Sequence, residues 1–301
     1  KWVFTISYTD DGQIKRYKAR LTARGDMQKE STESWSPTVS LSAIKSILSW
    51  SASQRYFINQ FDIKTAFLNG TLDPNERVYM STPPGLSDFT KFRYLHLLKA
   101  LYGLKQAGRR WSLLFRKTLT SLNLIQSEVE ECIFYSKTED GRQVVLFFWV
   151  DDIIVSSPTQ EATDNLMGNV LKIFKGKSLG TIQLFLGVSY NYKQVTGELS
   201  MNVAQYITAQ INSLEQKLGK QIILRRTPMY SEFLANVPRY KKSKPVDMTE
   251  YAVIQGILTY VAQYRLDIAV AVSIVAQYSH QPTEDFVEAQ YHILGYLSRT
   301  R

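Results

Sequence analysis

The sequence predicts an α+β fold, with an α/β fold as the alternative, from three observations. Hydrophobic residues make up 44% of the 301 residues, which is enough for a core in one large domain or in two to three small ones. Segments with the two-residue period of β-strands alternate with segments of helical period. A polar stretch that contains prolines, near residues 225–247, separates a helical C-terminal part from the rest.

Hairpin, helix and strand patterns follow one another in the first 130 residues. Apolar and polar residues alternate on both sides of Asp10-Asp11-Gly12, which predicts a hairpin. Ser40 is a candidate N-cap for the next helix. The expected elements are strands at 1–9 and 14–22, a helix at 41–56, a strand at 57–68, a loop at Pro83-Pro84-Gly85 and a helix at 106–125 with Trp111 and Phe115 in its apolar stripe.

Apolar strands and amphipathic helices continue in the second half of the chain. Valine, isoleucine and phenylalanine dominate residues 143–156, which is typical of strands. Ala162, Leu166 and Val170 recur at helical spacing. The expected elements are strands at 131–136 and 143–156, a helix at 160–176, a strand pair at 184–191 and 197–202, a helix at 204–218, an irregular linker at 225–247 and helices over roughly the last 50 residues.

Composition excludes several classes of protein. A single cysteine, Cys132, excludes a disulfide framework and a zinc site built on cysteine pairs, and it favours a reducing compartment. No apolar run reaches the roughly 18 residues of a membrane span, and the N-terminus lacks a signal-peptide pattern. The chain begins with Lys1 rather than Met, which suggests a piece cut from a longer chain.

Basic residues are clustered within a formal net charge of +9. Residues 99–117 contain six Lys and Arg residues and no acid, and residues 216–246 contain eight against one acid, Glu232. Such clusters fit a polyanionic partner, but they also fit solvated surface faces. Charge alone leaves these two interpretations even.

Two adjacent acids, Asp151 and Asp152, interrupt the apolar run VVLFFWVDDIIVS. We expect a tight hairpin with the acids at or beside its turn, although Asp-Asp fits such a turn less well than Asn-Gly. Carboxylates on a rigid hairpin would suit Mg²⁺, which prefers hard oxygen ligands. A surface turn with two solvated acids is the alternative, and for an isolated Asp-Asp it is the better one.

A third acid, Asp62, lies in the apolar segment NQFDIKTAFL, where a charge is costly unless it is paired or bound to metal. If this strand lies beside the hairpin, three carboxylates converge. Three carboxylates are enough to hold two Mg²⁺ ions for in-line displacement at phosphorus.

Seven motifs in unbroken order resemble the reverse transcriptase of copia-type LTR retrotransposons. They are RYKARLTARG, WSPTV, QFDIKTAFLNG, VYMSTPPG, LLKALYGLKQAGRRW, WVDDIIV and LFLGV, over about residues 1–228. The segment that begins YAVIQGILTY resembles the part that follows in those polyproteins, ahead of the RNase H domain. Each motif alone is weak, whereas the ordered set is very specific. One departure is Trp149, where the family usually has tyrosine.

The resemblance implies a right-hand polymerase of fingers, palm and thumb with an antiparallel palm sheet. The expected boundaries are 1–187 for interleaved fingers and palm, 188–246 for a thumb-like segment and linker, and 247–301 for a helical connection segment towards an RNase H domain. No acid set for RNase H follows residue 247, so we expect no template degradation by these residues.

The resemblance also implies the catalytic residues. Asp62 and Asp151 would be the principal ligands of two Mg²⁺ ions, for which Mn²⁺ could substitute, and Asp152 would assist. The backbone of Ile63 would lie at the metal and the triphosphate.

Further residues are implied to bind the substrates. Lys18 and Arg20 would hold the triphosphate through charge-assisted contacts. Phe67 would exclude a ribose 2′-OH, and a core phenylalanine is its alternative interpretation. The other implied residues are Gly103 and Gln106 for dNTP binding, Phe185, Leu186 and Gly187 for primer positioning, and Lys175 or Lys177 for protonation of the departing pyrophosphate.

The expected function is RNA- and DNA-directed DNA synthesis. The implied partners are an RNA template, a DNA or tRNA primer, dNTPs, and the integrase and RNase H portions of the same polyprotein, without a membrane. The implied location is a cytoplasmic virus-like particle, with the nucleus at later stages. The alternative is a catalytically inactive relic that binds nucleic acid, and a segment with only an assembly role is a weaker third interpretation. The intact acid triad argues against the inactive relic.

Overall fold

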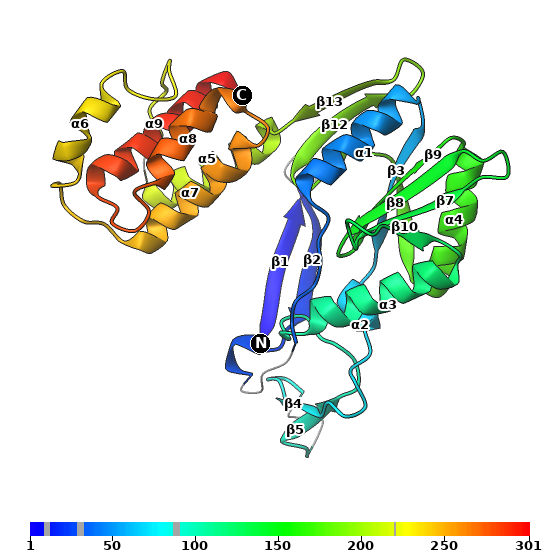
Figure 1. Cartoon of the computed structure of the whole chain (residues 1–301). Coiled ribbons are helices and arrows are strands. Elements are labelled where there is room, and N and C mark those ends of the chain that lie inside the picture. The colour runs from blue at the N-terminus through cyan, green and yellow to red at the C-terminus, as the bar shows by residue number, and fades with distance from the viewer. Residues whose placement is uncertain (9–12, 29–32, 87–90, 220) are drawn as a thin grey trace. The chain divides into compact units, whose positions relative to one another are not determined.

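The computed structural model describes residues 1–301 except 9–12, 29–32, 87–90 and 220 (Figure 1). The chain forms two compact units, one of residues 1–182 and 192–198 and the other of residues 183–191 and 199–301. Helices and antiparallel strands occur together, as the α+β prediction requires. No helix in the described part of the chain is both long enough and apolar enough to span a bilayer.

A six-stranded antiparallel sheet forms the core of the first unit (Figure 1). Its order is β10–β3–β9–β8–β7–β6, so the two strands predicted to carry acids, β3 and β9, are neighbours. The bounds are β3 (Phe57–Ile63), β6 (Ile125–Gln126), β7 (Ile133–Lys137), β8 (Gln143–Trp149), β9 (Asp152–Ser157) and β10 (Gly176–Thr181).

Helices α1 (Leu41–Ser53) and α4 (Gln160–Ile173) cover opposite faces of this sheet. The Ser156 hydroxyl, on β9, donates a hydrogen bond to the Ser51 Oγ of α1 over 2.6 Å. Ser157, the next residue of β9, shares a 2.6 Å hydrogen bond with Thr163 of α4. Successive strand residues point to opposite faces, so the two helices lie on opposite sides. Both faces of β9 are therefore buried, which explains its unbroken apolar run.

A third helix, α3 (Ala107–Ser121), packs on the sheet through aromatic side chains. Trp111 and Phe115 are fully buried, and their rings stack with centroids 5.0 Å apart. Phe115 also meets Phe148 of β8 edge-on at 4.9 Å. These contacts confirm the predicted apolar stripe. The predicted cap of α1 is confirmed too, since the Ser40 Oγ accepts from the Ala43 N–H over 3.2 Å.

Two smaller ladders complete the first unit. The predicted hairpin is confirmed as β1 (Trp2–Tyr8) and β2 (Ile14–Leu21), while its expected turn at 10–12 lies outside the described residues. A second ladder of β4 (Val78–Ser81) and β5 (Tyr94–Leu97), and the 3₁₀ turn η1 (Gly25–Met27), were not predicted.

The strand predicted over 57–68 is wrong in its second half. Strand β3 ends at Ile63, because Thr65 has the left-handed φ of 51° and starts the short helix α2 (Ala66–Asn69). Phe67 therefore lies on a helical turn and not on the strand that carries Asp62.

The second unit is mainly helical. Its ladder of β11 (Leu184–Phe185), β12 (Val188–Lys193) and β13 (Glu198–Asn202) shares residues of the last two strands with the first unit. The helices are α5 (Ala204–Leu218), α6 (Phe233–Tyr240), α7 (Met248–Ala262), η2 (Leu266–Ile268), α8 (Ala269–Ala276) and α9 (Glu284–Thr300). The irregular linker predicted at 225–247 thus contains a helix, α6. Its Phe233 and Tyr240 pack against Phe286 of α9, and tertiary burial outweighs the helix-breaking Pro238.

Candidate active site

Asp62 and Asp152 lie directly opposite each other in the β3–β9 pair. Opposite residues share one face of a sheet, with Cβ atoms about 4.5–5.5 Å apart. Asp151 lies directly before Asp152, in the two-residue turn Val150–Asp151 that joins β8 to β9. The structure therefore brings the three predicted acids together at one end of the sheet, as expected if the two segments were neighbours. All three are half-buried, unlike the solvated acids of a surface turn.

The Val150–Asp151 turn is held by hydrogen bonds to both of its carbonyls. Val150 has a φ of 57°, an unusual value for a β-branched residue. The indole Nε1–H of Trp111 donates to the Val150 carbonyl over 2.6 Å, and the Ile63 N–H donates to the Asp151 carbonyl over 2.9 Å. The backbone of the turn is thus fixed while the Asp151 carboxylate stays out of these bonds. The sequence predicted Trp111 only as a core residue, and no local signal pointed to its bond with the turn.

Burial raises the pKa of both Asp151 and Asp152, and the neighbouring carboxylates raise these values further. Three effects oppose this shift. The Gln60 Nε2 donates to the Asp152 Oδ1 over 3.3 Å, and a backbone hydrogen bond and, less strongly, the charge of Arg20 lower the pKa of Asp151. No ion pair recorded between described residues involves Asp62, Asp151 or Asp152. A bound cation would relieve this concentration of negative charge.

The donor set suits Mg²⁺ only together with a substrate. Within the described ranges, no three Asp, Glu, His or Cys side chains are grouped closely enough to hold a metal ion. Mg²⁺ commonly takes one or two protein carboxylates and completes its octahedral shell with water and substrate phosphate. The hard oxygens of Asp62, Asp151 and Asp152 fit that mode of binding, in which substrate supplies part of the shell.

Hydrogen bonds connect the residues just after the β1–β2 hairpin to the loop that contains Gly103. The Ala23 N–H donates to the Tyr102 carbonyl over 2.7 Å, and the Gly25 N–H to the Gly103 carbonyl over 2.9 Å. Gly103 has a φ of 86°, and an added Cβ would lie 2.3 Å from the Ala23 carbonyl oxygen. Glycine is therefore required at this position because the loop closely approaches the backbone of Ala23, just after β2.

Arg20 acts on the acid site through its charge. Lys18 and Arg20 lie on one face of β2, opposite Thr5 and Val3 of β1. The charge of Arg20 lowers the pKa of both Asp151 and Tyr102, so its guanidinium lies within electrostatic reach of Asp151. Lys18 is half-buried on the same face, and its contact with dNTP stays a prediction.

Tyr102 begins the stretch Tyr102–Gln106, which the sequence resemblance implies to lie beside the nucleotide and the template. Burial and the charges of Asp151 and Asp62 raise its pKa. Its ring meets that of Phe67 edge-on, with centroids 5.1 Å apart. Phe67 is partly buried and packs against an apolar cluster of Leu72, Val78, Ala100, Leu104 and Ala107. Phe67 therefore has a core contact on one side and Tyr102 on the other.

Gln106 and the three arginines of the basic cluster at 99–117 have internal partners. Gln106 is 1% exposed, and its amide donates to Glu76 over 2.5 Å. Arg110 pairs with the same carboxylate group at 2.7 Å, Arg109 pairs with Glu33, and Arg116 with Glu131. The charges of these three arginines are thus paired within the chain. Neither a polyanionic partner nor a solvated face, the two interpretations of the cluster, predicted this pairing. The predicted contact of Gln106 with dNTP stays a prediction.

Lys177 lies opposite Asp62 in the β10–β3 pair, on the side away from Asp152. Lys175 instead uses its backbone carbonyl, which accepts from the Lys64 N–H over 2.8 Å. Both side chains are exposed. The register therefore favours Lys177 over Lys175 as the lysine nearest the acids. Phe185, Leu186 and Gly187 belong to the second unit, and their role in primer positioning stays a prediction.

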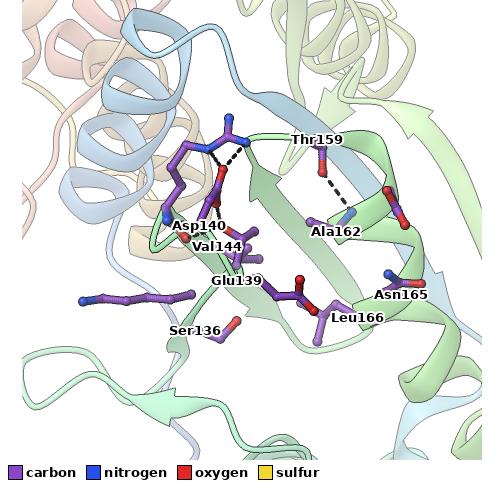
Figure 2. A pocket seen from close by; sticks show the side chains of 12 residues that line it. Ser136, Glu139, Asp140, Val144, Thr159, Ala162, Asn165 and Leu166 are labelled. Carbon is purple, nitrogen blue, oxygen red and sulfur yellow. Dashed lines mark hydrogen bonds and ion pairs between the residues drawn. The ribbon is translucent and has the colours of Figure 1, made fainter.

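A groove of about 500 Å³ lies elsewhere in the first unit (Figure 2). It runs between the β7–β8 connection and the start of α4, and Asp140, Val144 and Asn165 are among its lining residues. Val144 stands near the start of β8, whereas Asp151 and Asp152 follow the end of that strand. Figure 2 shows Asp140 bound to the Arg142 guanidinium, so this charge is satisfied locally. The groove is not part of the acid site.

Two carboxylates on adjoining antiparallel strands and a third in the adjoining turn therefore lie together, as the sequence predicted for Asp62, Asp152 and Asp151. The family described as reverse transcriptase (RNA-dependent DNA polymerase) matches residues 1–224. The chain belongs to this family.

Relatives of similar sequence are retrotransposon polyproteins. The chain is 34% and 32% identical to the Retrovirus-related Pol polyproteins from transposons RE1 and RE2 of Arabidopsis thaliana, and 31% identical to that from transposon TNT 1-94 of Nicotiana tabacum. Each alignment covers 100% of the chain but only 20%, 20% and 23% of the respective polyprotein. The predicted resemblance to copia-type reverse transcriptases is confirmed, and the chain spans about a fifth of these relatives.

Proposed function

We propose that the chain catalyses RNA- and DNA-directed DNA synthesis. The primer 3′-OH attacks the α-phosphate of a dNTP, a new P–O bond forms, and the bond to the β-phosphate breaks as pyrophosphate leaves. The observation that carries the proposal is the register of β3 and β9, which sets Asp62 opposite Asp152 with Asp151 in the adjoining turn. Family membership supports the same reaction.

Asp62 and Asp151 would hold the divalent ions, and Asp152 would assist. The Ile63 N–H donates to the Asp151 carbonyl. The backbone group of Ile63 that could bind a metal ion is therefore its carbonyl. Two Mg²⁺ ions, or Mn²⁺, would activate the primer hydroxyl and neutralise charge at the transferring phosphate. The fixed turn keeps the Asp151 carboxylate oriented and so lowers the cost of reorganisation during the reaction.

The remaining residues of the first unit would bind the nucleotide. Arg20, with Lys18 on the same strand face, would hold the triphosphate, and Phe67 beside Tyr102 would exclude a ribose 2′-OH. Lys177, opposite Asp62, would donate a proton to the departing pyrophosphate. In this proposal the first unit corresponds to fingers and palm, and the second unit contains the thumb-like and connection segments.

Nucleic acid would contact the basic stretch at 216–246. Part of its charge is neutralised by α9, since Arg225 pairs with Glu288 at 3.5 Å and Lys244 with Glu284 at 3.1 Å. The remaining charge would track the phosphates of a template–primer hybrid, so affinity should fall as salt rises. The proposed partners are an RNA template, a DNA or tRNA primer, and the integrase and RNase H portions of a polyprotein.

Primer extension on poly(rA)/oligo(dT) with dTTP and Mg²⁺ tests the proposal. We expect extension by the wild-type chain and none by Asp151→Asn, with hybrid affinity retained in both. A wild-type chain that binds the hybrid without extending it would instead support the inactive, nucleic-acid-binding relic.

A further inference from the structure

The turn between β11 and β12 has an unfavourable backbone at its first position. Leu186 and Gly187 form this turn, with φ values of 51° and 78°. Two positive φ values are typical of a type I′ hairpin turn, in which the left-handed region suits glycine but rarely leucine. The Leu186 conformation therefore depends on contacts from outside the turn. We call residues 184–188 the primer hairpin.

Two tyrosines from separate helices supply these contacts. The hydroxyl of Tyr260, on α7, donates a hydrogen bond to the Leu186 carbonyl. The ring of Tyr206, on α5, covers Gly187 so closely that an added Cβ would lie 3.2 Å from its Cδ2. The two rings pack together with centroids 4.7 Å apart. The turn is thus fixed at both of its residues by helices of the same unit.

We propose that Tyr260 is a positioning residue for DNA synthesis, which holds the primer hairpin through the Leu186 carbonyl. Helix α7 lies beyond residues 1–224, which the reverse transcriptase family matches. The inference rests on the proposed function and extends it, because it makes the C-terminal helices part of the polymerase rather than a spacer. Burial and the neighbouring phenols raise the pKa of Tyr260, so its hydroxyl remains a donor throughout the pH range of an assay.

Removal of this hydroxyl would free the Leu186 carbonyl and let the turn relax. Phe185, fully buried beside the turn, would keep the hairpin attached to its unit. The expected defect is therefore a displaced primer 3′ end and not a loss of hybrid affinity. A displacement of this kind should lower kcat by about 10- to 100-fold, while KM for dTTP stays near the wild-type value.

Tyr260→Phe in the full chain tests the proposal, with Tyr291→Phe as the matched control. Tyr291 also lies in the second unit and donates a phenol hydrogen bond, to Glu250 over 3.3 Å, away from the hairpin. The measurements are kcat and KM for dTTP, hybrid affinity by fluorescence anisotropy, thermal melting, and the fluorescence of 2-aminopurine at the primer 3′ end in the bound hybrid.

We expect Tyr260→Phe alone to lower kcat and to change the 2-aminopurine signal, with unchanged hybrid affinity. Equal kcat in both variants, or a defect confined to melting, would overturn the positioning role. Absence of extension by the wild-type chain would contradict the proposed function itself. In that case the 2-aminopurine signal still tests the positioning role of Tyr260, because an unchanged signal in Tyr260→Phe would overturn the inference.

Discussion

Asp62 faces Asp152 across the β3–β9 ladder, so two like charges occupy directly opposite positions on one face of a sheet. Like charges in this arrangement destabilise a strand pair, and burial adds to the cost. Asp151 in the adjoining turn increases the negative charge further. Repulsion of this kind makes the free site electrostatically unfavourable, and a bound cation can relieve it.

Asp152→Asn should therefore stabilise the chain in the absence of divalent metal. Asparagine keeps an oxygen acceptor for Gln60 but removes a charge opposite Asp62. We expect the free energy of unfolding to rise by about 0.2–1 kcal/mol at pH 7.5, measured by urea titration.

The pH dependence gives the sign of this effect. The pKa of Asp152 is raised in the folded chain, so the wild type loses stability as pH rises from the unfolded value, about 3.9, through the folded value. The advantage of Asp152→Asn should therefore be complete at pH 7.5 and shrink as pH falls through the folded pKa of Asp152. Asp164→Asn, which changes an exposed acid on α4, serves as the control. A variant that is less stable than wild type at pH 7.5 would refute the assignment.

Trp111→Phe should impair synthesis more than binding. Phenylalanine keeps the stacking on Phe115 but removes the donor to the partly buried Val150 carbonyl. The loss of one hydrogen bond costs about 0.5–1.5 kcal/mol, which should appear as lowered stability in urea. We expect kcat to fall by at least about 10-fold with hybrid affinity unchanged, because a loosened turn misplaces Asp151. Equal losses in kcat and affinity would indicate general unfolding instead.

Phe67→Val should weaken discrimination against ribonucleotides. A smaller side chain beside Tyr102 leaves room for a 2′-OH, and contacts of this size usually change selectivity by about 10- to 200-fold. The measurement is the ratio of kcat/KM for dTTP and UTP on the same hybrid. Phe67 also packs against the apolar cluster that contains Leu104, so the thermal stability of the variant must be measured together with its kinetics. An unchanged ratio in a folded variant would leave Phe67 as a core residue only.

Cys132 should be inert in the native chain. It is 1% exposed, its thiol donates to the Pro37 carbonyl over 3.2 Å, and burial raises its pKa to about 12. The neutral thiol is thus favoured in the folded state, and its contribution to stability is lost only as pH rises above the value of an unfolded cysteine, about 8.5. Ellman's reagent at pH 8 should react with Cys132 only after denaturant is added. Rapid reaction without denaturant would contradict this burial.

The acids could be predicted from the sequence because each violates the composition of an apolar strand. Asp62 and the Asp151-Asp152 pair stood out for that reason, and their strands proved to be neighbours. The Trp111 bond to Val150 could not be predicted, since it depends on where α3 lies relative to the turn. The Arg110–Glu76 pair joins residues 34 apart in sequence, so the basic cluster looked free.

Backbone conformation set a second limit on prediction. Thr65 ends β3 through a left-handed φ that its residue type does not favour, and this placed Phe67 on a different element from the one expected. Helix α6 forms around Pro238 because Phe233 and Tyr240 bury against α9, a tertiary contact with no local pattern.

Single-turnover incorporation of dTTP on an RNA template tests the central claim most directly. The wild-type chain, Asp62→Asn, Asp151→Asn and the control Asp164→Asn would be compared at saturating hybrid, with Mg²⁺ varied and binding measured on the same preparations. We predict Mg²⁺-dependent incorporation by the wild type and the control, and none by the two site variants at undiminished hybrid affinity. Incorporation by Asp62→Asn or Asp151→Asn at the wild-type rate would contradict the proposal that these carboxylates form the polymerase site.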